Sequence, residues 1–209
     1  MQFLKINTKY NYHEAWLWLQ QKGIEVFGKN FNLHQDDKPQ IYLLLCYFLQ
    51  DHQAAQQLNL NLNKGILLTG PVGCGKTSLM QLMKFFIQKP DQKFTIKSCR
   101  DISFEFIENG FDTIRKYATY HTLGGGGSFC FDDLGVENSL KYYGNECNVM
   151  AEILLSRYDL FTTHNLTTHL TTNLSASEIE NTYGNRVRSR MRTMFNLIAF
   201  DRNSEDKRK

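Results

Sequence analysis

The clearest candidate for chemistry is a glycine-rich stretch that fits the pattern G-x-x-x-x-G-K-[ST] at every fixed position. Its residues are Gly70, Pro71, Val72, Gly73, Cys74, Gly75, Lys76 and Thr77. In this pattern a glycine turn opens a helix, so backbone N–H groups and the positive end of the helix dipole converge on an anion. We therefore expect this phosphate loop and Ser78 to bind nucleotide phosphates. Lys76 would reach the β- and γ-phosphates, and Thr77 would hold Mg²⁺.

An acidic pair follows a second apolar segment. Residues 128–131 predict a strand that ends at Asp132 and Asp133. Acidic pairs also occur in ordinary turns, but downstream of a phosphate loop they are typical of the second half of an ATP site. Asp132 would hold Mg²⁺ together with Thr77, and Asp133 would polarise the attacking water. The order of these segments implies a sheet in which another strand lies between the phosphate-loop strand and the acidic strand.

A second pattern bears on whether the nucleotide is ATP or GTP. Residues 132–135 also satisfy D-x-x-G, which GTPases carry. A GTPase should then show N-K-x-D downstream, to bind guanine. The one Asn-Lys pair, Asn63-Lys64, precedes the phosphate loop and is followed by Gly65-Ile66. The sequence therefore favours ATP over GTP.

A polar amide follows a further predicted strand. Residues 166–172 are rich in β-branched side chains and predict a strand that ends at Asn173. If this strand lies beside the acidic strand, the Asn173 amide could contact the γ-phosphate or the attacking water. Asn is also a common turn residue, so the spacing alone leaves both interpretations open.

Four arginines gather on one predicted helix, residues 183–194. At helical spacing Val187, Met191 and Met194 form its inward stripe. The arginines then fall on two flanks, with Arg186 and Arg190 on one and Arg188 and Arg192 on the other. The helix is either a solvated basic face, or one flank reaches the nucleotide of a neighbouring subunit and stabilises charge on the γ-phosphoryl group. The other flank could then contact nucleic-acid phosphates.

The remaining elements must position these groups. Residues 66–69 before the phosphate loop predict a strand, and residues 78–87 after it predict a helix. The connection 124–127, with four glycines, is expected on the far side of the sheet from the nucleotide. The other predicted elements are a strand or arm at 3–6, helices at 13–27, 39–57, 102–120 (interrupted by Gly110), 145–161 and 175–183, and strands at 94–98 and 194–200.

Composition limits the class of protein. The chain has 209 residues, 42% of them hydrophobic, which suffices for a sizeable core. Its five cysteines lack C-x-x-C spacing, which argues against a zinc site or a disulfide framework and favours a reducing cytoplasm. The longest apolar run, 41–49, is too short to cross a membrane, and the N-terminus lacks the pattern of a signal peptide. The net charge is only +3, although basic residues crowd together from Arg186 onward.

Four stretches together resemble the AAA+ ATPases of the bacterial helicase-loader and transposition-helper group (DnaC-like and IstB-like proteins). They are residues 70–77, 129–137, 170–175 and 183–192. The resemblance covers residues 60 to 202 and implies a three-layer α/β P-loop NTPase fold (AAA+/ASCE) with a central, mostly parallel five-stranded sheet. We expect a helical N-terminal region at 1–60, an ATPase core at 61–203, an absent or vestigial lid, and a basic disordered tail at 204–209.

The resemblance also implies roles. Asn173 would take the sensor-1 position and Arg190 the arginine-finger position, with Arg186 one turn before it. The helix at 102–120 would line a path for single-stranded DNA. The protein would be a Mg²⁺-dependent ATPase that works as a homo-oligomer in replication or transposition, with a replicative helicase or a transposase as partner.

One departure bears on activity. Asp133 stands where many AAA+ proteins have Glu, and its shorter reach predicts slow turnover. An ATP-gated scaffold with little hydrolysis is therefore one alternative. A P-loop enzyme of small-molecule metabolism is another, although Asn173 and the arginine helix argue against it.

Overall fold

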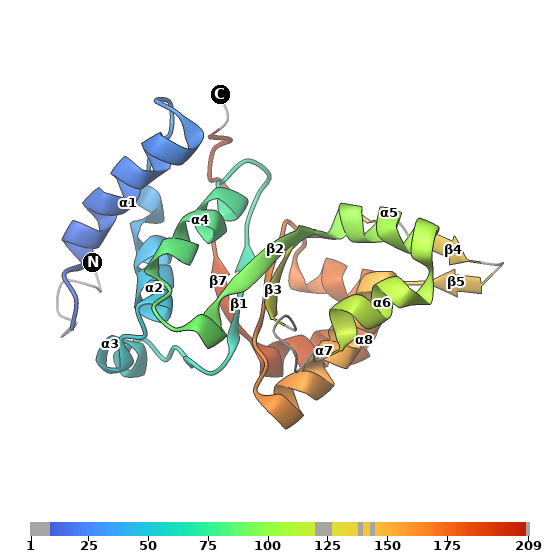
Figure 1. Cartoon of the computed structure of the whole chain (residues 1–209). Coiled ribbons are helices and arrows are strands. Elements are labelled where there is room, and N and C mark those ends of the chain that lie inside the picture. The colour runs from blue at the N-terminus through green and yellow to red at the C-terminus, as the bar shows by residue number, and fades with distance from the viewer. Residues whose placement is uncertain (1–8, 120–126, 138–139, 143–144, 208–209) are drawn as a thin grey trace.

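A central sheet of five parallel strands organises the chain, in the order β2-β3-β6-β1-β7 (Figure 1). The computed structural model describes residues 9–119, 127–137, 140–142 and 145–207. The strands are β1 Gly65–Thr69, β2 Phe94–Ser98, β3 Ser128–Leu134, β6 Thr168–Thr172 and β7 Phe195–Ala199, with a separate antiparallel pair, β4 Leu140–Tyr142 and β5 Asn145–Cys147. The predicted fold class is confirmed, and β6 is the strand inserted between β1 and β3.

Two layers of helices cover the sheet, one on each face (Figure 1). The first layer contains α1 Tyr12–Phe27, α2 Lys38–Phe48, α3 His52–Gln57 and α4 Lys76–Met83. The second contains α5 Cys99–Asn109, α6 Phe111–Ala118, α7 Val149–His164 and α8 Ala176–Met194. The described residues also include short 3-10 turns at Gln35–Asp37, Lys84–Phe86 and Pro90–Gln92.

Each face of the sheet has its own core because side chains alternate along a strand. In β1, Ile66 and Leu68 pack with the first helical layer, whereas Leu67 packs with the second. A run of apolar residues without polar alternation is what a strand buried on both faces requires.

Capping residues and glycines divide two of the predicted helices. The helix expected at 39–57 is two helices, because the Asp51 carboxylate accepts a hydrogen bond from the Ala54 N–H and starts α3. The helix expected at 102–120 is broken at Gly110, whose φ is 55°.

Two further boundaries differ from the predictions. The helix expected at 145–161 begins only at Val149, since Asn148 caps it and residues 145–147 form β5. In contrast, α8 continues from the predicted 175–183 helix into the arginine helix, with a kink at Gly184 (φ 83°, ψ 160°).

Two predicted segments lie wholly or mostly outside the described parts of the chain. The strand or arm at 3–6 lies wholly outside them, and of the connection at 124–127 only Gly127 is described. In the described parts, no helix combines the length and the apolar character needed to span a membrane.

Candidate nucleotide-binding site

The phosphate loop joins the C-terminal end of β1 to the N-terminus of α4. Gly73 and Gly75 have φ values of 81° and 94°, which residues with a Cβ rarely adopt. Gly75 stands at the N-cap of α4, where no described side chain accepts a hydrogen bond from the first turn. The first N–H groups of α4 are therefore directed at the loop without a side-chain cap, which is the arrangement that binds anions at helix N-termini.

Lys76 is held against this loop. Its Nζ donates to the carbonyl oxygens of Gly70 and Pro71, both at 2.9 Å, and to Asn173 Oδ1 at 2.6 Å. Burial lowers the pKa of Lys76, and the nearby Cys74 thiol and acidic pair act in the opposite direction. All three oxygen acceptors are neutral, so a bound phosphate would offer the lysine a stronger, charged partner.

Thr77 and Asp132 form the second part of the site. Thr77 Oγ1 donates to the Asp132 carboxylate, 2.9 Å from Oδ1 and 3.0 Å from Oδ2, and Thr171 Oγ1 lies 2.6 Å from the same Oδ1. Asp132 is buried, and burial raises its pKa against the effect of the two hydroxyl groups. A hydroxyl oxygen beside a carboxylate is a hard-oxygen donor set, so Thr77 and Asp132 fit Mg²⁺.

Asp133 occupies an irregular position in β3. Its φ is 56°, which is uncommon for a residue other than glycine, and its backbone N–H donates to Thr171 Oγ1 at 2.9 Å. The pairing of β3 with β6 shifts register between Phe131 and Leu134. The acidic pair thus lies at a bulge inside the strand and not after its end, and strained backbone of this kind clusters at functional positions.

Asn173 directly follows β6, which pairs with β1 on one side and with β3 on the other. The carboxyl end of β6 therefore lies between the phosphate loop and the acidic pair. The sequence left open whether Asn173 only makes a turn. Its side chain bonds to Lys76, 97 positions away in the chain, and so takes part in the loop.

No described hydrogen bond or ion pair joins an arginine of α8 to this site, although Arg188 and Arg192 line the larger cavity beside it. The predicted inward stripe of Val187, Met191 and Met194 is buried, as expected. Arg188 pairs with Glu180, whereas the Arg190 guanidinium lies over the ring of Tyr158, 4.9 Å from its centroid. No described contact joins Arg190 to Lys76, Thr77 or the acidic pair within the same chain.

The C-terminal segment covers the outer side of the phosphate loop, next to the first helical layer (Figure 1). The Lys207 backbone N–H donates to Gly73 O at 3.1 Å, and its Nζ donates to Cys74 O at 2.9 Å and pairs with Asp37. The Asp206 carboxylate packs so closely on Gly73 that a Cβ there would lie 2.1 Å from Asp206 Oδ1. Within the stretch 204–209, which was expected as a basic disordered tail, Lys207 thus contacts the phosphate loop and the buried Asp37 carboxylate, a partner that the sequence does not reveal.

Sequence reasoning also missed Arg157, which is fully buried in α7. Its guanidinium donates to Thr168 Oγ1 at 2.9 Å and to the carbonyl oxygens of Tyr117 and Thr167, both at 3.2 Å. Burial lowers its pKa to about 10. Arg157 thereby ties α6 and α7 to the start of β6, the strand that positions Asn173. No motif signals this role, since a single Arg in an amphipathic helix normally faces solvent.

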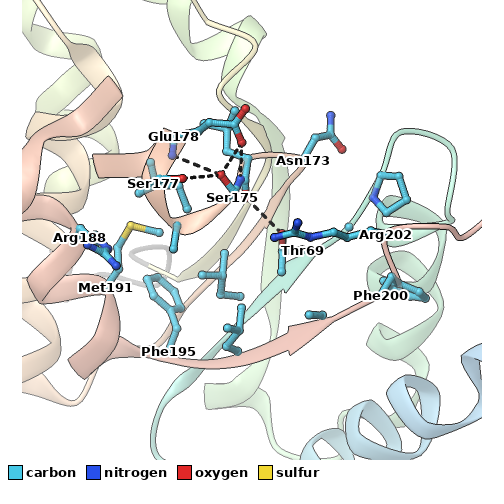
Figure 2. Close-up of a pocket in the computed structure, with 18 of the residues that line it drawn as sticks. Thr69, Asn173, Ser175, Ser177, Glu178, Arg188, Met191, Phe195, Phe200 and Arg202 are labelled. Atoms are coloured by element: carbon cyan, nitrogen blue, oxygen red, sulfur yellow. Dashed lines mark hydrogen bonds between the residues drawn. The ribbon is translucent and has the colours of Figure 1, made fainter. Parts of the chain in front are cut away.

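One cavity adjoins the phosphate loop, and another adjoins the C-terminal segment that covers the loop. The larger, of about 840 Å³, extends from Gly70 and Asn173 along α8 and β7, and Figure 2 shows Ser175, Glu178 and Arg202 around it. The smaller, of about 580 Å³, lies between residues 30–34 and the C-terminal segment. Both volumes fall within the range of small-molecule sites. The larger cavity therefore gives the phosphate loop open space on the side of Asn173 and α8.

Comparisons with known proteins identify the fold. No protein-family model and no curated protein sequence matches the chain. Among solved structures, the DnaC helicase loader is 20% identical, with 83% of this chain and 95% of that chain covered at a TM-score of 0.55. DnaI is 20% identical, with 82% and 89% covered and a TM-score of 0.53.

A third structure is the replication initiator DnaA bound to AMPPCP and single-stranded DNA, which is 15% identical at a TM-score of 0.50. The match covers 82% of this chain but only 48% of the DnaA chain, so this chain spans about half the length of that protein. At these identities the likeness concerns the fold. The chain has a three-layer α/β P-loop NTPase fold similar to those of DnaC and DnaA, as the sequence resemblance predicted.

Proposed function

We propose that this protein is an AAA+ ATPase of the helicase-loader group, which binds and hydrolyses ATP with Mg²⁺ in DNA replication or transposition. One observation carries the proposal: two hydrogen-bonded pairs, Lys76 with Asn173 and Thr77 with Asp132, lie at the carboxyl ends of neighbouring parallel strands. Ligands bind at this edge in open α/β sheets. The similarity of the fold to helicase loaders supports the replication role.

Each group then has a definite task. The N–H groups of the phosphate loop and of α4 bind the phosphates, and Lys76 exchanges its carbonyl partners for phosphate oxygens. Thr77 and Asp132 would hold Mg²⁺, which supplies positive charge against the phosphates. Asp133 orients the attacking water and accepts its proton as the water oxygen bonds to the γ-phosphorus and ADP departs. Asn173 contacts the γ-phosphate or the water.

Arg190 is proposed to act on the ATP of a neighbouring subunit in a homo-oligomer. Two facts support this: within its own chain it has no described contact with the site, and its buried Nε has no described hydrogen-bond partner. A guanidinium in trans would stabilise charge on the transferred phosphoryl group. Oligomer formation would then be required for hydrolysis but not for ATP binding.

Single-stranded DNA is proposed to lie along α5 and α6. This face exposes Phe104, Ile107 and Phe111, and the Arg100 guanidinium lies 5.4 Å from the centroid of the Phe104 ring. Exposed aromatic rings beside arginines are the platforms on which unpaired bases stack. The DnaA structure that contains single-stranded DNA supports this class of ligand.

A protein partner, either a replicative helicase or a transposase, is proposed for the N-terminal region, residues 1–60. Helix α1 exposes the large apolar side chains of Leu17, Trp18 and Phe27, which a partner could cover. We further propose that the protein acts in the cytoplasm, where replication proteins work.

The assignment of the site can be tested by Lys76→Ala. We expect ATP binding, measured by titration calorimetry, to weaken by at least tenfold, because the variant loses the only lysine of the loop. Lys89→Ala, in the exposed turn after α4, is the matched control and should bind ATP as the wild type does. Unchanged binding by Lys76→Ala would refute the assignment.

The oligomeric role can be tested by Arg190→Ala. Phosphate release at high protein concentration should fall at least tenfold while ATP binding persists. Arg192→Ala, on the opposite flank of α8, is the matched control and should release phosphate at the wild-type rate. The assay contains no DNA, because this second flank could contact nucleic-acid phosphates. Light scattering with and without ATP and single-stranded DNA shows whether the protein assembles and binds nucleic acid.

An ATP-gated scaffold is the second candidate function. The short Asp133 side chain at a bulge favours it, since a carboxylate with less reach activates water less well. A single-turnover assay with and without single-stranded DNA separates the two functions: a scaffold retains its ATP in both conditions.

A further inference from the structure

Glu137 fastens the turn that follows the acidic pair. Its Oε2 accepts a hydrogen bond from the Gly135 N–H at 2.9 Å, and its Oε1 accepts one from the Tyr183 hydroxyl. Gly135 has a φ of 106°, and a Cβ on it would come within 2.6 Å of Leu174, the neighbour of Asn173. The turn is therefore confined between Glu137 on one side and the end of β6 on the other.

Tyr183 stands at the other end of this bond, directly before the kink of α8. Its side chain is buried, and burial together with the Glu137 carboxylate raises the pKa of the hydroxyl, which therefore remains a proton donor. The neighbouring Thr182 carbonyl accepts a hydrogen bond from Asn148 Nδ2 at 3.0 Å. These contacts fix the first half of α8 to the body of the domain.

The kink separates this half from the arginine segment, residues 185–194. A Cβ on Gly184 would meet no atom within 4 Å, so the position has room for a side chain. Glycine is required there because of the backbone conformation: a φ of 83° is rarely adopted by residues with a Cβ. Gly184 thus acts as a backbone joint, and the direction of the arginine segment depends on the contacts on either side of it.

We propose that Glu137 and Tyr183 are positioning residues that couple the acidic turn of one ATP site to the arginine segment that serves the site of the neighbouring subunit. The inference rests on the proposed function, because it requires Arg190 to act in trans. A shift of Asp133 toward the attacking water moves the turn at residues 134–137. The bond from Glu137 transmits that shift to Tyr183 and through the joint at Gly184 to Arg190. Neither residue touches ATP.

A mixing experiment isolates this coupling. The acceptor subunit carries Arg190→Ala and keeps its phosphate loop and acidic pair. The donor subunit carries Asp133→Asn, which keeps ATP binding and its arginine but removes the carboxylate that accepts the proton of the attacking water. In a mixture, a complete site forms only where an acceptor loop meets a donor arginine. Tyr183→Phe is then introduced into either the donor or the acceptor. It removes one hydroxyl, keeps the ring in the core, and leaves the Glu137–Gly135 bond in place.

We expect Tyr183→Phe in the donor to lower phosphate release by the mixture about tenfold, since small misplacements of a group that acts on the transition state are costly. In the acceptor it should change the rate by less than about twofold. Glu137→Gln in the donor should also lower the rate, because a single amide oxygen cannot replace the two carboxylate oxygens that accept from the Gly135 N–H and from the Tyr183 hydroxyl. Tyr47→Phe, a buried tyrosine in the opposite core, is the matched control and should have no effect in the donor.

The outcomes separate the two proposals. If the starting mixture regains no activity over its separate components, action in trans is wrong, and the coupling fails with it. If activity returns but Tyr183→Phe lowers it equally in donor and acceptor, or in neither, the coupling alone is overturned. Thermal unfolding of each variant shows whether a lost rate comes from a lost fold.

Discussion

Lys76 Nζ lies 2.6 Å from Asn173 Oδ1, so the lysine of the phosphate loop is bonded to the residue that ends the strand next to it. The bond connects the phosphate loop to the carboxyl end of β6. A γ-phosphate would take over the lysine, and Asn173 would be released to contact phosphate or water. We expect this exchange to link nucleotide binding to the geometry of the reaction.

Asn173→Ala should separate binding from hydrolysis. Loss of the amide removes a competitor for Lys76, so the dissociation constant for ATP should change less than about threefold, while the rate of phosphate release falls at least tenfold. Calorimetry and a steady-state assay measure the two quantities. A large loss of affinity with an unchanged rate would instead make Asn173 a ground-state binding residue. Asn109→Ala, at the exposed end of α5, serves as the control.

His169 should make stability depend on pH. Burial lowers its pKa to about 3, from 6.5, and its Nδ1 accepts a hydrogen bond from the Ile66 N–H at 3.1 Å. The unfolded chain therefore takes up a proton below pH 6.5 that the folded chain refuses. Neutral His169 makes its full contribution to the free energy of unfolding above pH 6.5. As the pH falls below this value, the free energy of unfolding decreases by up to about 1.4 kcal/mol per pH unit.

Urea denaturation at pH 7.5, 6.5 and 5.5 can measure this dependence. His169→Gln stays neutral throughout and serves as the reference, because other groups titrate equally in both proteins. The stability of the wild type relative to the variant should decrease as the pH falls. Parallel curves would show that His169 is protonated in the folded protein.

Arg157→Ala should destabilise the fold strongly. The substitution removes three hydrogen bonds and opens a cavity. The acceptor oxygens of Thr168, Thr167 and Tyr117 then lose the donor that Arg157 supplied. We expect a loss of at least about 3 kcal/mol in the free energy of unfolding, measured in urea. Arg157→Met, which fills most of the space, should lose less. A change below about 1 kcal/mol for Arg157→Ala would mean that water replaces the guanidinium.

Lys207→Ala should weaken the attachment of the C-terminal segment to the phosphate loop. It leaves the Asp37 carboxylate, 6% exposed in the side chain, without its cation. We expect a loss of about 1–3 kcal/mol, moderated because the segment can lift and admit water. Faster amide exchange at Gly73, Cys74 and Gly75 should accompany it.

A double-mutant cycle with Asp37→Asn tests that pairing. The double variant should be more stable than the sum of the single losses predicts, because neutral Asn no longer needs the cation. Additive losses would show that the two residues act independently.

The sequence by itself determined the parts of the protein whose physics is local. The phosphate loop needs a strand, glycines with positive φ and a helix N-terminus within a few residues, and all of these are legible in residues 65–83. Apolar periodicity likewise predicted the five strands and the buried stripe of α8. The order of the segments predicted a strand between β1 and β3, and the structure shows that this strand is β6. Helix boundaries were less accurate, because single residues such as Asp51, Asn148 and Gly184 decide them.

Only the tertiary structure decided which side chains meet across the layers. Asn173 lies 97 positions from Lys76, Glu137 lies 46 from Tyr183, and Lys207 lies 170 from Asp37. No periodicity or motif predicts such pairs, because their distances depend on how the strands are ordered and how the helices pack on each face. The sequence located the phosphate loop and the acidic pair. The packing of the layers determined that Lys76 is bonded to Asn173 and that Arg190 is directed elsewhere.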